Sequence, residues 1–308
     1  MGSENVAIVG AGAVGCYFGG MLARAGVPVM LIGRTPHVEA IKRDGVFIER
    51  NDFQEFVRVN AQSEASAVCE AAIVLLSVKT IDTETAATAI ALHLQKSAIL
   101  VSLQNGVDNV ERIRKATGIR AMPAAVYVAA SMTGPGRVRH SGRGDLVVGE
   151  PSFGLERPDS VPRIAHLFEA AHVPCRISPN IAVELWTKLV MNCAYNAISA
   201  VTQSQYLKIE ENALAREVIR QLIEEVVAVG KAAGVLLPDA AELMESALKL
   251  GRAMANATSS TAQDLARGRL TEIDSLNGYV SRRGKELGVP TPVNSTLHTL
   301  VKLLELKI

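Results

Sequence analysis

The chain has 308 residues, which is enough for two domains of ordinary size, each with its own hydrophobic core. Its 32 basic and 31 acidic residues leave a formal net charge of +1 at pH 7, and no dense block of Lys and Arg occurs. A near-neutral chain without a basic patch is not expected to bind nucleic acid.

Metal, disulfide and membrane signals are also weak. The four cysteines lie far apart and form no C-x-x-C pair, so they suggest neither a zinc site nor a disulfide framework. The chain opens without the charged and apolar segments of a signal sequence. The most apolar helical stretch, residues 181–201, carries Glu, Lys and two Asn, which are costly in a bilayer. We expect a cytoplasmic protein that uses no metal ion and binds no membrane.

The first half of the chain alternates short β-branched runs with helical segments. The runs cover residues 5–9, 28–32, 72–78, 98–103, 124–128 and 145–149. Such alternation favours a parallel sheet with helices on both faces. Between the second and third runs, "GVFIER" (45–50) and "EFVRVN" (55–60) are expected to pair as a small ribbon.

The second half has helical periodicity and no further strand runs. Breaks fall near residues 234–238, near 258–260 and at "GVPTP" (288–292). The predicted fold is therefore an α/β domain over residues 1–179 followed by an all-α domain over residues 180–308. A cleft between two such domains is the usual place for a ligand.

A glycine-rich turn follows the first predicted strand. Gly10, Gly12 and Gly15 fit the pattern G-x-G-x-x-G, with a strand before it and a helix and a second strand after it. In this context the glycines allow a tight turn, a close approach of the backbone to a pyrophosphate and close helix packing. The cofactor-binding candidates are Gly10, Ala11, Gly12, Ala13, Val14 and Gly15.

Three residues after later strands extend this candidate site. Arg34 stands where enzymes that use NAD place an acid, and a guanidinium suits the 2′-phosphate of NADPH; the alternative is a solvated loop charge. Lys79 and Asn105 follow strands at the edge where open α/β sheets bind ligands. As alternatives, Lys79 could be a charge flanking a helix, and Asn105 part of an ordinary Asn-Gly turn.

The apolar helix "ELWTKLVMNCAYNAISA" (184–200) carries Lys188, Asn192 and Asn196 at intervals of four, so they form one line. The ordinary interpretation is a solvated face with an ion pair from Glu184 to Lys188. Against it, Asn is a poor helix former whose amide suits specific hydrogen bonding. Delivery of hydride to a ketone needs a proton donor, no histidine lies in a promising context, and Lys188 is the best-placed acid.

Two polar groupings in the second half have ordinary interpretations as helix caps. Ser259 and Ser260 precede a helix, and Thr271 with Asp274 fits a capping box. Glu272 between them suits any first helical turn.

The order of these motifs resembles that of the ketopantoate reductase (2-dehydropantoate 2-reductase) family over nearly the whole chain. The matching segments are "GAGAVG", "LLSVKT", "LQNG", "ELWTKLVMNCAYNAISA", "SSTAQD" and "TEIDSLNG". The resemblance implies a Rossmann-type NADP-binding domain followed by a helical domain similar to that of 6-phosphogluconate dehydrogenase. It also implies NADPH-dependent reduction of ketopantoate to (R)-pantoate, in the synthesis of pantothenate and coenzyme A.

The resemblance assigns roles residue by residue. Lys188 matches the family's acid and Glu272 its active-site glutamate, which also lies at the cofactor. Lys79, Asn105 and the backbone of Ala130 match contacts to the cofactor. Contacts to the substrate match Asn105, Lys188, Asn192, Asn196 and Ser260. The stretch "TQSQYLK" (202–208) departs from the family pattern and leaves one substrate contact open.

Two alternative functions stay open. Another 2-oxo acid could be the substrate of the same scaffold, because a relative can keep the lysine and change the pocket for the acyl group. A sensor that binds NADPH without turnover would lack a proton donor, whereas Lys188 and Glu272 are both present. The oligomeric state, including a homodimer, is open as well.

Overall fold

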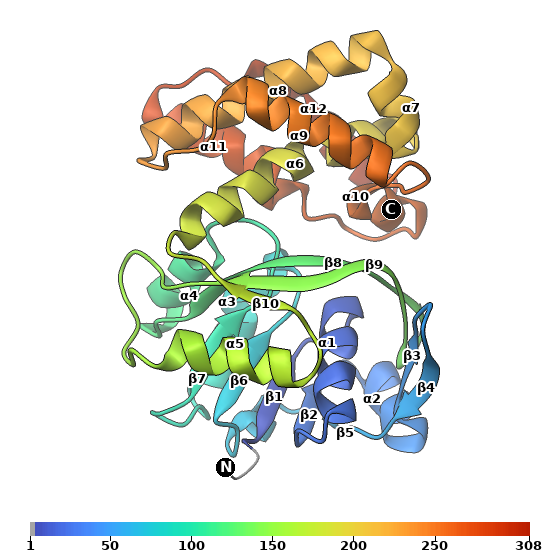
Figure 1. Cartoon of the computed structure of the whole chain (residues 1–308), viewed down its shortest axis with the longest axis vertical. Coiled ribbons are helices and arrows are strands. Elements are labelled where there is room, and N and C mark those ends of the chain that lie inside the picture. The colour runs from blue at the N-terminus through green and yellow to red at the C-terminus, as the bar shows by residue number, and fades with distance from the viewer. Residues whose placement is uncertain (1–3) are drawn as a thin grey trace. The chain divides into compact units, whose positions relative to one another are not determined.

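The computed structural model describes residues 4–308, which divide into two compact units. The first unit contains the chain up to Gln104 together with Asp108–Ile181, and the second contains Asn105–Val107 together with Ala182–Ile308. The first unit is mixed α/β and the second is helical, so the predicted fold class is confirmed (Figure 1). The short segment Asn105–Val107 belongs to the second unit although both of its neighbours in sequence belong to the first.

The sheet of the first unit has the strand order β4-β3-β9-β8-β7-β6-β1-β2-β5, with β10 pairing β9. From β5 through β8 every neighbouring pair is parallel, and β8 pairs β9 antiparallel. The strands are β1 (Val6–Val9), β2 (Val29–Ile32), β3 (Val46–Glu49), β4 (Gln54–Val57), β5 (Asn60–Gln62), β6 (Ile73–Leu76), β7 (Ile99–Ser102), β8 (Met122–Gly134), β9 (Arg137–Val148) and β10 (Cys175–Ile177).

Two local predictions for this sheet had different outcomes. The ribbon is confirmed, because β3 and β4 pair antiparallel with Val46 opposite Val57. The runs at 124–128 and 145–149 lie in β8, which joins the sheet parallel to β7, and in β9, which pairs parallel with β10. With each other they are not parallel, because β8 and β9 form one long antiparallel hairpin in which Val126 lies opposite Leu146. The turn at Gly136, with φ of +65°, is far too short for the crossover that a parallel pair requires.

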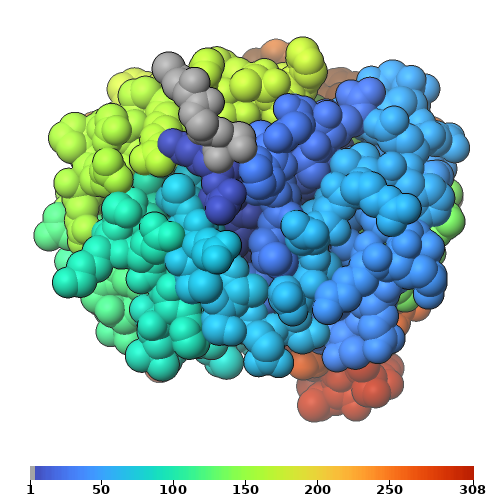
Figure 2. All heavy atoms as spheres, turned by 90° about the horizontal axis from the view of Figure 1, so that it is seen from below, coloured from blue at the N-terminus to red at the C-terminus, as the bar shows by residue number. Residues whose placement is uncertain are grey.

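Helices cover both faces of this sheet. Alternation along β6 sends Ile73 and Leu75 into one core cluster with α1 and α5, and Val74 and Leu76 into the other with α3 and α4. Figure 2 shows one face of this unit, with the residues of α5 (yellow-green) and of β3–β4 (blue) at opposite sides. The helices are α1 (Ala13–Arg24), α2 (Thr35–Asp44), α3 (Thr83–Ala91), α4 (Asn109–Thr117) and α5 (Ser160–Ala170), with 3-10 turns η1 (Ala65–Val68) and η2 (Thr80–Asp82).

The second unit packs its helices around the apolar side of α6, which contributes Leu189, Val190 and Cys193 to the core. Three helices end just before the three breaks read from the sequence, and the side chains of Asp239 and Ser259 cap the helices that follow the first two breaks. Asn212 caps another helix at a break that was not predicted from the sequence. The elements are α6 (Ile181–Thr202), α7 (Tyr206–Glu211), α8 (Ala213–Ala232), α9 (Ala240–Ala253), α10 (Ser260–Ala266), η3 (Ile273–Ser275), α11 (Asn277–Leu287) and α12 (Pro292–Glu305). Over residues 4–308, no helix is long and apolar enough to cross a membrane.

Candidate functional site

The glycine-rich turn lies between β1 and α1 in the first unit. Gly10 has φ of +117°, and a Cβ there would lie 2.8 Å from the backbone carbon of Ser77. A Cβ on Gly15 would lie 1.9 Å from the Gly10 oxygen, which also accepts a hydrogen bond of 2.9 Å from the Ser77 hydroxyl. The turn is therefore held tightly against the end of β6, and both positions require glycine.

The same turn leaves space where a phosphate would bind. A Cβ on Gly12 would meet no heavy atom within 4 Å, no side chain caps α1 at Gly12, and the first turn of α1 has no acid. The backbone amides at a helix start carry partial positive charge and attract phosphate. Ala11 is buried, and Ala13 and Val14 pack against the core, so this arrangement fits the pyrophosphate of a dinucleotide.

The other candidate residues of the first unit lie on neighbouring elements. Arg34 is exposed and lies two residues after the end of β2, at the start of α2. Lys79 follows β6 and precedes η2, and Ala130 lies within β8. Arg34 and Lys79 both lie beyond the carboxyl ends of parallel strands, where ligands of such sheets bind.

Gln104 was not among the sequence candidates, although it holds the turn that carries Lys79. It is buried, and its amide nitrogen donates to the Val78 carbonyl at 3.1 Å and to the Thr83 hydroxyl at 2.8 Å. The Ser102 hydroxyl donates to the side-chain oxygen of Gln104, Oε1, at 3.0 Å. The motif "LQNG" contains this glutamine, but two of its partners, Val78 and Thr83, lie in the loop after β6 and at the start of α3 and could not be read from spacing.

In the second unit, three of the sequence candidates form one hydrogen-bonded chain. The Lys188 ammonium donates to Asn105 Oδ1 at 2.9 Å, and Asn105 Nδ2 donates to Glu272 Oε2 at 2.9 Å. These residues are separated by as many as 167 positions in sequence. The lysine is therefore hydrogen-bonded to an amide, and the amide to a carboxylate. In this arrangement the lysine could act as an acid, and the amide and carboxylate could orient it.

The electrostatics of this chain favour proton donation by Lys188. Desolvation lowers the pKa of Lys188 from 10.5 to about 8, and the charge of Glu272 opposes this shift. A pKa near the working pH is what an efficient general acid needs.

The rest of the polar line on α6 is buried or partly buried. Asn196 is only 3% exposed and Asn192 is partly buried. The Ser259 hydroxyl donates to the Asn196 carbonyl at 3.1 Å and accepts from the Ala262 amide at 3.0 Å. Ser259 is thus the cap of α10, as expected, and it attaches the start of α10 to α6. Ser260 is the exposed first residue of α10.

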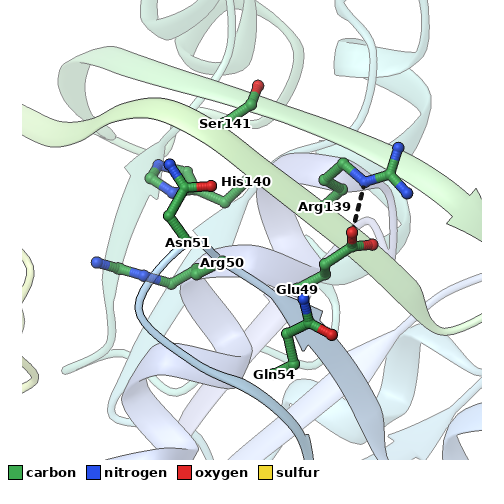
Figure 3. Close-up of a pocket in the computed structure, with 7 residues that line it drawn as sticks. All are labelled: Glu49, Arg50, Asn51, Gln54, Arg139, His140 and Ser141. Carbon is green, nitrogen blue, oxygen red and sulfur yellow. Dashed lines mark ion pairs between the residues drawn. The ribbon is translucent and has the colours of Figure 1, made fainter.

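A polar pocket of about 290 Å³ lies in the first unit and was not expected from the sequence (Figure 3). Arg139 pairs with Glu49 at 2.9 Å, and Arg50 pairs with Asp52 at 2.8 Å, so the charges at this pocket are compensated. Its walls come from β3, the turn after it, the start of β4 and β9, and no motif marks them. The lining residues are Glu49, Arg50, Asn51, Gln54, Arg139, His140 and Ser141.

The fold and the glycine turn are those of an NAD(P)-dependent oxidoreductase, and comparisons with known proteins agree. The family model of ketopantoate reductase PanE/ApbA matches residues 6–152, and the model of its C-terminal part matches residues 180–305. The chain is 30% identical over 300 residues to a 2-dehydropantoate 2-reductase of Pyrococcus abyssi, with 97% of each chain covered. The chain belongs to the ketopantoate reductase family.

Solved structures support the same assignment and widen the range of substrates. A PanE/ApbA family ketopantoate reductase from Ralstonia eutropha is 48% identical, with a TM-score of 0.91 over 98% of this chain and 99% of that one. D-Mandelate dehydrogenase with NADH and anilino(oxo)acetate is 25% identical, also with a TM-score of 0.91, over 98% of this chain and 99% of that one. The same fold therefore occurs in enzymes that are named for different substrates, and one of these enzymes was solved with NADH.

Proposed function

We propose that the protein uses NADPH to reduce the 2-oxo group of ketopantoate, giving (R)-pantoate for the synthesis of pantothenate and coenzyme A. The observation that carries this proposal is the chain from Lys188 through Asn105 to Glu272, because reduction of a ketone needs a proton donor of suitable pKa. The full-length relatives named 2-dehydropantoate 2-reductase support ketopantoate as the substrate.

When bound, NADPH supplies the hydride to C2 of the 2-oxo acid. The Lys188 ammonium donates a hydrogen bond to the 2-oxo oxygen and passes its proton to that oxygen as negative charge develops there. The products are a 2-hydroxy acid and NADP⁺, and solvent returns the proton to Lys188. Asn105 and Glu272 keep the ammonium oriented, because a carboxylate can only accept and so directs the amide oxygen of Asn105 toward Lys188.

The remaining candidates have binding roles in this proposal. Asn192, Asn196 and Ser260 would hold the hydroxyl and carboxylate of ketopantoate with neutral donors. Residues 10–15 and Lys79 would bind the dinucleotide, with the backbone of Ala130. Arg34 supports NADPH over NADH, because a guanidinium pairs well with a 2′-phosphate and an NAD site would carry an acid there.

A second candidate function is reduction of a different 2-oxo acid. The similarity to D-mandelate dehydrogenase, which was solved with NADH and anilino(oxo)acetate, favours this alternative. It would keep the roles of Lys188, Asn105 and Glu272 and change only the groups that recognise the acyl substituent.

A steady-state assay of cofactor oxidation distinguishes reduction of ketopantoate from reduction of a different 2-oxo acid. The panel contains ketopantoate, 2-oxoisovalerate, pyruvate and phenylglyoxylate, each with NADPH and with NADH. We expect the highest kcat/KM for ketopantoate with NADPH, and an inactive Lys188→Met variant serves as the control. A preference for phenylglyoxylate with NADH would support the alternative, and no turnover with any 2-oxo acid would refute both.

A further inference from the structure

The segment that carries Glu272 has little structure of its own. Glu272 precedes η3 (Ile273–Ser275), and no side chain caps the start of this short turn. The capping box expected for Thr271 and Asp274 does not form, because both side chains bind α12 instead. Something outside the segment must therefore hold Glu272 against Asn105.

Thr271 is fixed to α12 on the upstream side of Glu272. Its backbone amide donates to Glu305 Oε1 at 2.8 Å, and its hydroxyl donates to the same oxygen at 2.6 Å. That hydroxyl also accepts from the Ile273 amide at 3.2 Å, so the residues on both sides of Glu272 depend on it. Thr271 and Glu305 are buried, and Lys302 compensates the Glu305 charge at 2.6 Å.

Asp274 is fixed to the same helix on the downstream side. Its two oxygens contact His298 Nε2 at 2.6 Å and Lys302 Nζ at 2.9 Å. A Cβ on Gly278 would lie 2.7 Å from His298 Nε2, so the start of α11 closes over this contact. His298 and Lys302 are four residues apart and lie on one face of α12.

The helix that holds both anchors is itself held at its start. Both oxygens of Glu225, from α8, accept backbone amides of α12: Val293 at 2.8 Å and Asn294 at 2.9 Å. A carboxylate at a helix start satisfies amides that have no partner within the helix and complements the dipole. The helix that binds Thr271 and Asp274 is therefore itself held in place by α8.

We propose that α12 positions Glu272 for catalysis, with Thr271 and Glu305 as the positioning pair and Asp274 with His298 as the second anchor. This inference rests on the proposed function. A shift of the segment would affect Lys188 through Asn105. Glu272 would no longer fix which end of the Asn105 amide faces Lys188, and the ammonium would lose its acceptor. Misplacement by about 1 Å can cost as much as a hundredfold in rate.

The test compares Thr271→Val with Thr271→Ser. Valine keeps the shape and the backbone amide but removes the hydroxyl, whereas serine keeps the hydroxyl. We expect kcat to fall about tenfold or more in Thr271→Val and to recover most of its value in Thr271→Ser, while the Kd for NADPH is unchanged in both. Thr299→Val, on an exposed part of α12 where the hydroxyl bonds only its own helix at Ser295, is the matched control with normal kcat.

The pH profile of kcat/KM distinguishes positioning from a general loss of stability. Glu272 raises the pKa of Lys188, so a displaced Glu272 should move the alkaline limb of Thr271→Val to lower pH. An unmoved limb, or equal kcat in the valine and serine variants, would overturn the proposal even if the melting temperature falls. The comparison uses whichever 2-oxo acid the wild type reduces best, so a wrong substrate assignment refutes the proposed function and leaves this test intact.

Discussion

Replacing Lys188 by methionine should separate its chemical role from its contribution to packing. Methionine keeps most of the side-chain length but provides neither a charge nor a proton. We expect kcat to fall about a hundredfold or more, which is typical for removal of a general acid, with little change in the Kd for NADPH. In the wild type, kcat/KM should fall about tenfold per pH unit above a pKa near 8, and the variant should lack this limb.

The same substitution has a predictable effect on folding. The pKa of Lys188 is lowered from 10.5 to about 8 by desolvation, so the folded state disfavours the charged lysine. That cost is fully present below pH 8, where folded and unfolded chains are both protonated, and it fades as pH rises toward 10.5. Integrated over pH 7 to 10, the wild type should gain about 2–3 kcal/mol of unfolding free energy relative to Lys188→Met.

Urea unfolding followed by tryptophan fluorescence measures this difference. Trp186 is the one tryptophan in the sequence; it is buried in the second unit and packs edge-on against Tyr279, so it reports on the unit that contains Lys188. Each protein is measured at pH 7 and pH 10 without cofactor. An alkaline kinetic limb that survives in the variant, or a stability difference that is the same at both pH values, would refute the assignment of Lys188.

Three further changes test other parts of the site. Arg34→Ala should reduce affinity for NADPH by about tenfold to a hundredfold, the value of a charge-assisted phosphate contact, and leave NADH affinity unchanged; titration with both cofactors checks it, and an unchanged ratio would contradict the role of Arg34. Asn192→Ala should raise KM for ketopantoate with little change in melting temperature, and a normal KM would favour a face without substrate contact. Gly15→Ala should abolish NADPH binding and lower stability by about 1–3 kcal/mol, because the new Cβ would lie 1.9 Å from the Gly10 oxygen; NADPH binding that survives would show that the turn can relax.

The sequence predicted the elements that depend on local periodicity. The parallel strands, the glycine turn and the ribbon follow from alternation and turn residues within short windows. The hairpin β8–β9 was misjudged because its central residues carry many polar side chains and no strong strand signal. The identity of Lys188 as a candidate acid came from its spacing on α6 and from family resemblance.

The pairings within the second unit could not be predicted from spacing. Asn105 and Glu272 are 167 residues apart, and only folding brings the amide and the carboxylate together. His298 looked unremarkable because its partner, Asp274, lies 24 positions earlier on a different element. Thr271 and Asp274 matched a local capping pattern, yet α12 offered them stronger charged partners.

The lowered pKa of Lys188 should also make this side chain unusually reactive toward electrophiles. At pH 8 about half of Lys188 is a neutral amine, against about one in three hundred for a lysine with a pKa of 10.5. Desolvated lysines of this kind are the ones that condense with carbonyl compounds. An aldehyde reagent with borohydride should therefore label Lys188 ahead of exposed lysines, and a bound 2-hydroxy acid, which has no ketone to condense, should protect it, which provides a chemical probe of occupancy that needs no turnover.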